Sequence, residues 1–178
     1  MPIGPLMIEH RWIERVIADL QLRLGAHSPR KPIDPAYVER VVDFLRTYAD
    51  RCHHGKEEDI LFRDLEQKAL EPGLVASMRE LVSEHEWARA TTRRLVSAHA
   101  SSAAGNKDSM ADVRRLLADL ASFYPKHIEK EDKNFFRPVM ACLSTDEQQA
   151  MLGEFARFDA SLIHEKYRRL AQDLEAES

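Results

Sequence analysis

The sequence predicts an all-α protein: an up-down-up-down four-helix bundle with an additional C-terminal helix. Gly and Pro together make up only about 8% of the 178 residues, against roughly 12% in an average protein, so few residues interrupt long helices. Apolar residues recur every three or four positions along most of the chain, which is the period of an amphipathic helix. The loops are of moderate length, and such loops between long helices favour antiparallel neighbours.

The first two helices have clear boundaries. The first is predicted over residues 6–24 and ends at Gly25. The second begins with Asp34 as N-cap and Pro35 at the first helical position, a combination typical of a helix start. Its apolar stripe extends from Val38, and the helix is expected to continue to about residue 68 before the break at residues 71–73.

Three further helices follow. The third is predicted over roughly residues 74–99, and the fourth from residue 108 or 109 to about Pro138. Ser144 and Glu147 stand three apart, which is the capping-box spacing, so a fifth helix begins there. We expect residues 1–143 to form the bundle and residues 144–178 to pack on it within the same domain.

Composition and charge exclude several classes of protein. With 30 acidic residues against 26 Lys and Arg the formal charge is −4, and no basic tract offers a surface for nucleic acid or anionic lipid. No stretch approaches the roughly 18–20 apolar residues of a membrane helix. The start lacks the pattern of a signal peptide. The two cysteines, Cys52 and Cys142, are too few for a disulfide framework, so we expect a cytoplasmic protein.

A local repeat links the second and fourth helices. The pattern His-x-x-Lys-Glu-acid-x-x-x-Phe-Arg begins at His53 and again at His127, 74 positions later. Each histidine is followed four residues on by a glutamate, Glu57 or Glu131. Residues four apart on a helix lie only about 40° around it and about 6 Å along it, so each His and Glu point the same way. Imidazole and carboxylate together are ligands for iron, manganese or zinc, and a glutamate can bridge two metals.

The other two bundle helices each carry a histidine at the matching height. His10 and His85 lie on the first and third helices. Counted from the intervening loops at about 1.5 Å per residue, the histidines of the four helices agree in level to within about 6 Å. The sequence therefore predicts one metal centre in the bundle core, built from four separate helices.

These motifs resemble the hemerythrin-like, or HHE cation-binding, family over roughly residues 5–140. The resemblance implies a four-helix bundle with a non-haem di-iron centre. In that interpretation His10 and His53 bind one iron, and His85 and His127 bind the other. Glu57 and Glu131 bridge the two irons; zinc or manganese is possible in the purified protein. The resemblance also implies a small diatomic ligand or peroxide as partner.

The sequence departs from the oxygen carriers of that family at two points. Carriers have a second His four positions after the histidine of the third helix, where this chain has Arg89. The acid of the fourth helix stands five after its His in carriers, which favours Asp132; the four-residue spacing to Glu131 resembles the branch linked to iron–sulfur repair and iron sensing. Loss of a histidine ligand leaves an iron more open or lets another group fill the position.

Some candidate ligands have alternatives. His54 with Glu58 has the same spacing as His53 with Glu57, rotated about 100° around the helix, and His54 is a candidate extra ligand. Asp132 is a candidate either to replace Glu131 or to accept a hydrogen bond from a ligating histidine. The remaining histidines are interpreted as residues that do not belong to the metal site: His27, His99 and His164.

The sequence thus predicts a cytoplasmic di-iron protein that binds or reacts with O₂, nitric oxide or peroxide, in sensing or detoxification. One alternative is a metal-dependent signalling module without catalysis, and another is an iron–sulfur-repair type of di-iron protein. A third is a purely structural bundle. The sequence identifies neither a protein partner nor an electron donor, and it does not decide whether the protein is an enzyme.

Overall fold

The protein is all-helical, as the sequence predicts. A computed structural model describes residues 1–26, 33–106 and 109–176, with the side chains of the last helix described as far as residue 162. The described residues contain no strand. The elements in chain order are α1 (Ile3–Ala26), α2 (Pro35–Phe44), η1 (Leu45–His54), η2 (Glu57–Phe62), α3 (Arg63–Leu65), α4 (Pro72–Ala103), α5 (Ser109–Lys130), η3 (Glu131–Phe135), α6 (Phe136–Met140) and α7 (Thr145–Ala176), where η marks a π-helical segment.

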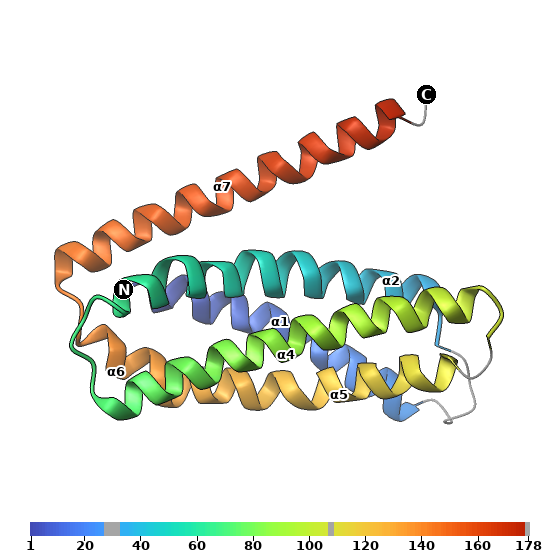
Figure 1. Cartoon of the computed structure of the whole chain (residues 1–178), viewed down its shortest axis with the longest axis horizontal. Coiled ribbons are helices and arrows are strands. Elements are labelled where there is room, and N and C mark those ends of the chain that lie inside the picture. Colours follow the sequence, from blue (N-terminus) through green and yellow to red (C-terminus); the bar gives the residue numbers. More distant parts are fainter. Residues whose placement is uncertain (27–32, 107–108, 177–178) are drawn as a thin grey trace.

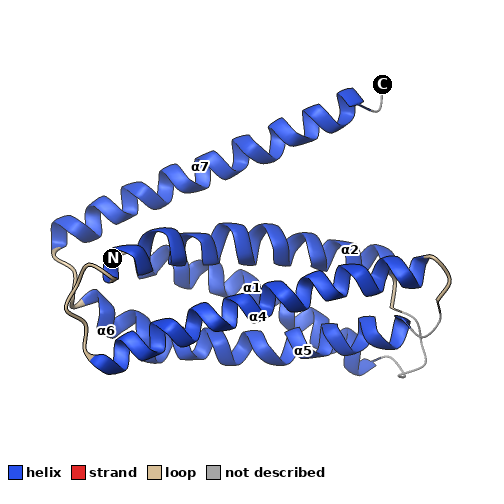
Figure 2. Cartoon of the chain, in the orientation of Figure 1, coloured by secondary structure: helices blue, strands red, loops and turns tan. Residues whose placement is uncertain are grey.

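Four long helical segments lie side by side as a bundle (Figure 1). They are α1, the continuous run from α2 to α3, α4, and the continuous run from α5 to α6. Within the bundle α5 packs against both α1 and α4, and α2 packs against α4. Figure 2 shows that the connections lie at the two ends of the bundle and that α7 leaves one of those ends. The middle of the bundle is therefore built from helix alone.

Two of the predicted helix starts are confirmed in atomic detail. The Asp34 carboxylate accepts a hydrogen bond from the Ala36 amide at 3.1 Å, with Pro35 at the first helical position. At the start of α7 the Ser144 amide donates to the Glu147 carboxylate at 2.8 Å, and the Glu147 amide donates to the Ser144 hydroxyl at 3.3 Å. This reciprocal pair is a capping box, so Ser144 and Glu147 fix where α7 begins.

The apolar core is divided into two halves along the bundle. One half, toward the α1–α2 and α4–α5 connections, is built around Leu20, Val38 and Leu117. The other half, toward α6 and the start of α7, is built around Leu61 and Phe136. Each fully buried side chain of this size stabilises the fold by about 1.5–3 kcal/mol relative to an exposed one. Between the halves lies a layer of buried polar side chains, which is the candidate site described below.

The second predicted helix is continuous but not regular. From Leu45 to His54 and from Glu57 to Phe62 its backbone is π-helical, and a third π-helical segment, Glu131–Phe135, lies on the fourth helix. The fourth helix ends at Met140, two residues past the predicted Pro138, and Pro125 lies inside α5. π-helical turns are rare and often occur at functional sites. All three here lie at or beside the histidine–glutamate motifs.

Helix α7 is attached to the bundle through its first half. Met151 and Phe155 are buried among the apolar residues of that end. The Phe158 ring lies against Gly55, at the junction of η1 and η2. Arg63 forms an ion pair with Glu154 at 2.8 Å. Farther along, α7 diverges from the bundle (Figure 1).

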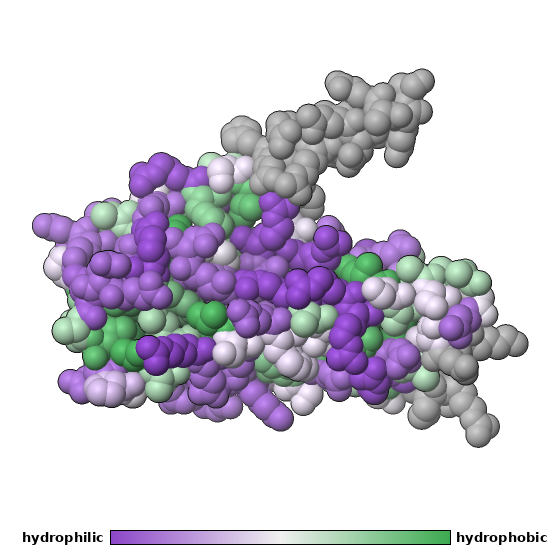
Figure 3. All heavy atoms as spheres, viewed as in Figure 1, coloured by the Kyte–Doolittle hydropathy of each residue, from purple (hydrophilic) through white to green (hydrophobic). Residues whose placement is uncertain are grey.

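The outer face of the bundle is mostly hydrophilic. Figure 3 shows polar residues over most of the visible face, with apolar residues in separate smaller areas. Among the helices of the described residues, none is long and apolar enough to cross a membrane.

The contact between Gly55 and Phe158 generates a first prediction. A Cβ at position 55 would lie 2.8 Å from Phe158 Cζ, so Gly55→Ala should lower the free energy of unfolding by about 1–3 kcal/mol through overpacking. In a Phe158→Ala background the same substitution should instead raise it by up to about 1 kcal/mol, because Ala favours helix over Gly. Urea denaturation of the four proteins measures both effects, and an equal effect in the two backgrounds would contradict this packing.

Candidate metal centre

Five histidines and two glutamates converge in the polar layer between the two apolar halves. His10 comes from α1, His53 and His54 from η1, His85 from α4, and His127 from α5. The glutamates are Glu57 of η2 and Glu131 of η3. All seven side chains are buried, with at most 2% of any residue exposed. Seven polar side chains from four helical segments thus occupy one water-excluded layer.

The seven residues form two groups of potential ligand atoms. The first cluster consists of His10, His53, Glu57 and Glu131, and its ligand atoms all lie within 4.8 Å of one another. The second cluster consists of the other three histidines, whose ligand nitrogens meet the same limit: His54, His85 and His127. The rings of His54 and His85 stack with their centroids 3.9 Å apart.

Each glutamate directs one oxygen toward each cluster. Glu57 Oε1 lies 3.4 Å from His53 Nε2, while its Oε2 lies 3.4 Å from His85 Nε2. Glu131 Oε2 lies 3.1 Å from His10 Nε2, while its Oε1 lies 3.4 Å from His127 Nε2. Both carboxylates therefore stand between the clusters, which is the position of a bridging ligand.

A set of outer carboxylates fixes the orientation of four of the histidines. His10 Nδ1 donates to Asp132 at 2.8 Å, and His85 Nδ1 donates to Glu58 at 2.6 Å. The other two Nδ1 atoms do the same: His53 to Glu9 at 3.0 Å and His127 to Glu84 at 2.8 Å. Since an ionised carboxylate only accepts, each of these Nδ1 atoms carries the proton. Nε2 of each of these rings therefore faces the clusters, and its lone pair is available to a metal when the ring is neutral.

The four outer carboxylates form a ring through the bundle. Each comes from the helical segment that precedes its histidine, and the last segment returns to the first. Glu9 of α1 accepts from the histidine of η1, and Glu58 of η2 accepts from the histidine of α4. Glu84 of α4 accepts from the histidine of α5, and Asp132 of η3 accepts from the histidine of α1, which closes the ring. Each outer carboxylate also pairs with a cation: Arg11 with Asp132, Lys56 with Glu9, Arg89 with Glu58, and Lys130 with Glu84.

The inward-facing atoms of the clusters have no hydrogen-bond partner. These buried atoms are both carboxylate oxygens of Glu57 and Glu131, both ring nitrogens of His54, and the Nε2 atoms of His10, His53, His85 and His127. A buried polar group without a partner costs about 1–3 kcal/mol, so a concentration of such atoms requires an explanation. Metal ions would satisfy these atoms together, except for Nδ1 of His54, which lies 3.6 Å from the Asp50 carboxylate on the side away from the clusters. The donor set of imidazole and carboxylate suits iron, manganese or zinc.

The electrostatics of the site point to a missing positive charge. Burial and the neighbouring Glu131 carboxylate raise the pKa of Glu57 well above its usual value. Burial and the adjacent imidazoles of His85 and His53 hold the pKa of His54 well below its usual value. Burial would raise the pKa of Glu131, but the neighbouring imidazoles of His127 and His10 outweigh it and lower that pKa. A bound cation would stabilise both carboxylates and neutral imidazole at once.

Aromatic side chains close the site on the α6 side. The Phe136 ring stacks on His10 with centroids 5.5 Å apart, and the Phe62 ring stacks on His85 at 6.1 Å. Phe135 lies edge-on to Phe62 and is fully buried. Leu61 and Ile128 are also buried. These walls exclude water, which strengthens every electrostatic interaction inside the site.

The six residues that the sequence selects as ligands are brought together, and so is His54. His53 and His54 both face the site because the wide turn of the π-helix reduces the angle between successive side chains below the about 100° of an α-helix. His53 and His54 are therefore both candidate ligands, and neither replaces the other. Glu58 and Asp132 lie outside the clusters as hydrogen-bond acceptors.

The remaining sequence candidates lie away from the clusters. Arg89, at the position where carriers have a histidine, bonds Asp50 and Glu58 at 2.6 Å each. His99 lies 3.5 Å from Glu39. His27 lies outside the described residues, and the side chain of His164 is likewise outside them.

Sequence reasoning missed Glu9 and Glu84 as supports of the histidines. Each directly precedes a histidine of the site, but each hydrogen-bonds the histidine of the next helix instead of its own neighbour. The recurring Glu-His dipeptide, together with the Lys of the repeat, was the available signal. Lys56 and Lys130 are those repeat lysines, and they are the cations paired with Glu9 and Glu84.

Comparison with known families assigns the chain to a class. Residues 1–139 match the hemerythrin HHE cation-binding domain, so the chain belongs to that family of cation-binding helical proteins. Searches of curated proteins and of solved structures gave no match. The match covers the whole of the two clusters and the ring, and it ends before α7.

The two repeat lysines generate a matched prediction. Lys56 is fully buried between Glu9 and Asp159, whereas Lys130 is partly exposed beside Glu80 and Glu84. Lys56→Met should lower the free energy of unfolding by about 3–5 kcal/mol because it leaves a buried carboxylate unpaired. Lys130→Met should cost at most about 1 kcal/mol.

Urea denaturation of the metal-free proteins measures this difference. The two variants remove the same charge from equivalent positions of the repeat, so each is the control for the other. Equal losses of stability would show that burial of Lys56 does not make its ion pairs more important.

Proposed function

We propose that this protein is a cytoplasmic non-haem di-iron protein that binds or reacts with O₂, nitric oxide or peroxide, in sensing or detoxification. The observation that carries the proposal is that Glu57 and Glu131 each direct one carboxylate oxygen toward each histidine cluster. Two carboxylates in that position suit two metal ions held close together. Family membership supports a cation as the ligand.

In this proposal every inward-facing group has a role. His10 and His53 bind one metal, and His54, His85 and His127 bind the other, with Glu57 and Glu131 bridging in an up-down-up-down bundle. His54 would supply the third histidine of the second cluster, where Arg89 cannot act as a ligand. Iron is the metal proposed, and zinc or manganese would be accepted by the same donor set. Two irons at bridging distance supply a site for a small ligand and the capacity for two-electron chemistry.

The residues around the two clusters indicate where a small ligand would bind. The first cluster offers two histidines and the second offers three, so a metal held by the first cluster would have fewer protein ligands and would be the one more able to take a small ligand. Its neighbour is the Phe136 ring stacked on His10, which favours a small, uncharged ligand and keeps bulk water out. The outer carboxylates Asp132 and Glu9 hold His10 and His53 in the tautomer that presents Nε2.

Anaerobic iron loading tests the proposal directly. We expect two iron ions per chain by elemental analysis, and a change of the optical spectrum when O₂, nitric oxide or peroxide is added. Protein that holds no iron after loading, with a spectrum unchanged by all three ligands, would refute the function. Zinc or manganese in its place, with no spectral response, would support the metal centre and refute the reactivity.

The outer carboxylates provide a second test. Glu84→Gln should weaken metal binding by roughly 10–100-fold, because the neutral amide is a poorer acceptor for His127 Nδ1. Glu86→Gln, two residues along on the exposed face of α4, is the matched control and should leave affinity unchanged. Competition with a chelator of known affinity measures both. Equal affinities of the two variants would count against ligation by His127.

A metal-dependent signalling module is the second candidate, because a chain of contacts leads from the site to α7. His53 donates to Glu9, Lys56 bridges Glu9 and Asp159, and Asp159 belongs to α7. In that function metal binding would change the protection of α7 against hydrogen exchange, while turnover of O₂ or peroxide is negligible. His53→Ala should remove the metal-dependent change. Rapid turnover with an α7 that is insensitive to metal would favour detoxification instead.

A further inference from the structure

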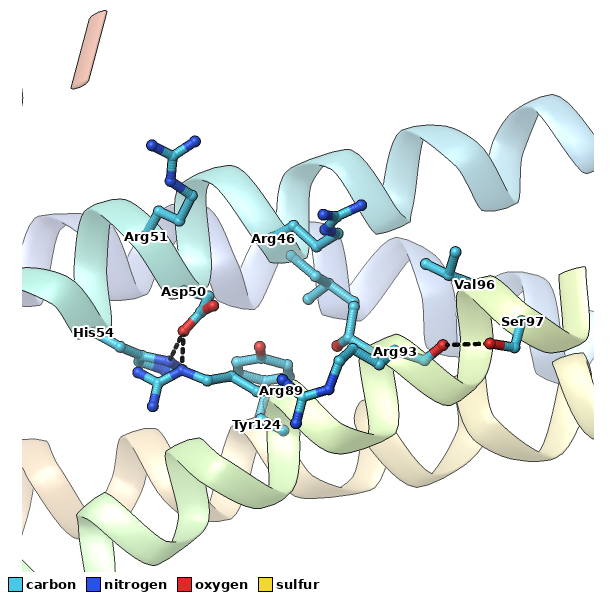
Figure 4. Close-up of a pocket in the computed structure, with 12 residues that line it drawn as sticks. Arg46, Asp50, Arg51, His54, Arg89, Arg93, Val96, Ser97 and Tyr124 are labelled. Atoms are coloured by element: carbon cyan, nitrogen blue, oxygen red, sulfur yellow. Dashed lines mark hydrogen bonds and ion pairs between the residues drawn. The ribbon is translucent and has the colours of Figure 1, made fainter. Parts of the chain in front are cut away.

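A cavity of about 480 Å³ opens beside the second cluster, between η1 and α4. The two elements line its sides, and His54 and Tyr124 lie at its floor (Figure 4). Ligand pockets for small molecules have volumes of roughly 300–1,000 Å³, so the cavity has the size of a binding site.

The side chains around this cavity are strongly cationic. Four arginines line it, Arg46 and Arg51 from η1 and Arg89 and Arg93 from α4, against the single carboxylate of Asp50. Asp50 is already neutralised, because Arg89 Nε donates to it at 2.6 Å. Arg89 is also paired with Glu58, so the positive charge available at the cavity belongs to Arg46 and Arg93.

Two of these arginines are available to a ligand. The guanidinium groups of Arg46 and Arg93 form no hydrogen bond or ion pair with any residue that the structure describes. In Figure 4 they extend from the two ribbons that flank the cavity, one from each side. A guanidinium presents a planar fork of donors that matches a carboxylate or phosphate group.

The floor of the cavity adds unpartnered polar atoms. Tyr124 is only 2% exposed, and its hydroxyl has no hydrogen-bond partner among the described residues and points toward the cavity (Figure 4). A phenol carries its proton at neutral pH, so this hydroxyl can donate a hydrogen bond. His54 is buried beside it with both ring nitrogens lacking a hydrogen bond.

We propose that this cavity binds a small organic anion with a carboxylate or phosphate group, held by Arg46 and Arg93 and by the Tyr124 hydroxyl. The two guanidinium groups would hold the anionic group at the mouth, and the hydroxyl would donate to it from the floor. The bound anion would then lie next to His54. The proposal rests on the cavity and its charges, and it holds whether or not the metal centre has the reactivity proposed above.

Calorimetric titration of the protein with succinate and with inorganic phosphate tests the proposal. We expect at least one of the two to bind with Kd below roughly 1 mM. Binding of succinate alone identifies a carboxylate ligand, and binding of phosphate alone identifies a phosphate ligand. The metal content of each protein is measured, so that a difference in metal loading is not mistaken for a difference in the cavity.

Two double variants decide whether the cavity is the site. Arg46→Gln with Arg93→Gln should weaken binding at least about tenfold, because both charge-assisted donors are lost. Arg79→Gln with Arg137→Gln removes the same charge from two exposed arginines that do not line the cavity and should leave Kd unchanged. Tyr124→Phe, which keeps the ring, should weaken binding about tenfold by loss of one hydrogen bond to a charged group.

Three results would overturn the proposal. The first is the absence of binding by both probes. The second is an equal loss of affinity in the two double variants, which would show only a general attraction between the protein and anions. The third is unchanged affinity in the Arg46→Gln, Arg93→Gln protein at equal metal content, which would place the anion elsewhere, including directly on the metal.

Discussion

The structure depends on the placement of seven ionisable side chains in a layer that water does not reach. Such groups are costly to bury unless each finds a partner. The ring of outer carboxylates meets this requirement on one side, because it satisfies Nδ1 of four histidines and fixes the rotation of their rings. The other side of the same rings is left with Nε2 atoms that only a cation can satisfy together. The contacts of this layer join all four helical segments of the bundle.

Much of the fold and six of the site residues could be predicted from the sequence because both depend on local spacing. Helical period, the Asp34 cap and the Ser144 capping box act within one or two turns, and so does the pairing of His53 with Glu57. His54 could not be assigned in the same way, since its direction depends on a π-helical backbone that no residue type specifies. The roles of Glu9 and Glu84 depend on contacts between different helices, which spacing along one helix does not reveal.

Two features connect the buried centre to the outside of the bundle, and they lie on different sides of η1. On one side Lys56 connects Glu9 of the ring to Asp159 of α7. On the other the cationic cavity reaches His54. The Lys56 contact is made beside the first cluster, through Glu9, and the cavity lies beside the second cluster, at His54. The centre is therefore closed by aromatic rings toward α6, and it is connected to α7 near the first cluster and to the cationic cavity near the second.

The ring has a consequence for how the protein is made. Because each outer carboxylate belongs to one helical segment and its histidine to the next, no half of the bundle contains a complete set of supported ligands. Glu131 contributes an oxygen to both clusters and lies near the end of the bundle sequence. During synthesis Glu9, Glu58 and Glu84 each emerge from the ribosome before the histidine that they support, whereas Asp132, which supports His10, emerges late, together with Glu131. The complete set of candidate ligands and their supporting carboxylates therefore exists only after η3 has been synthesised.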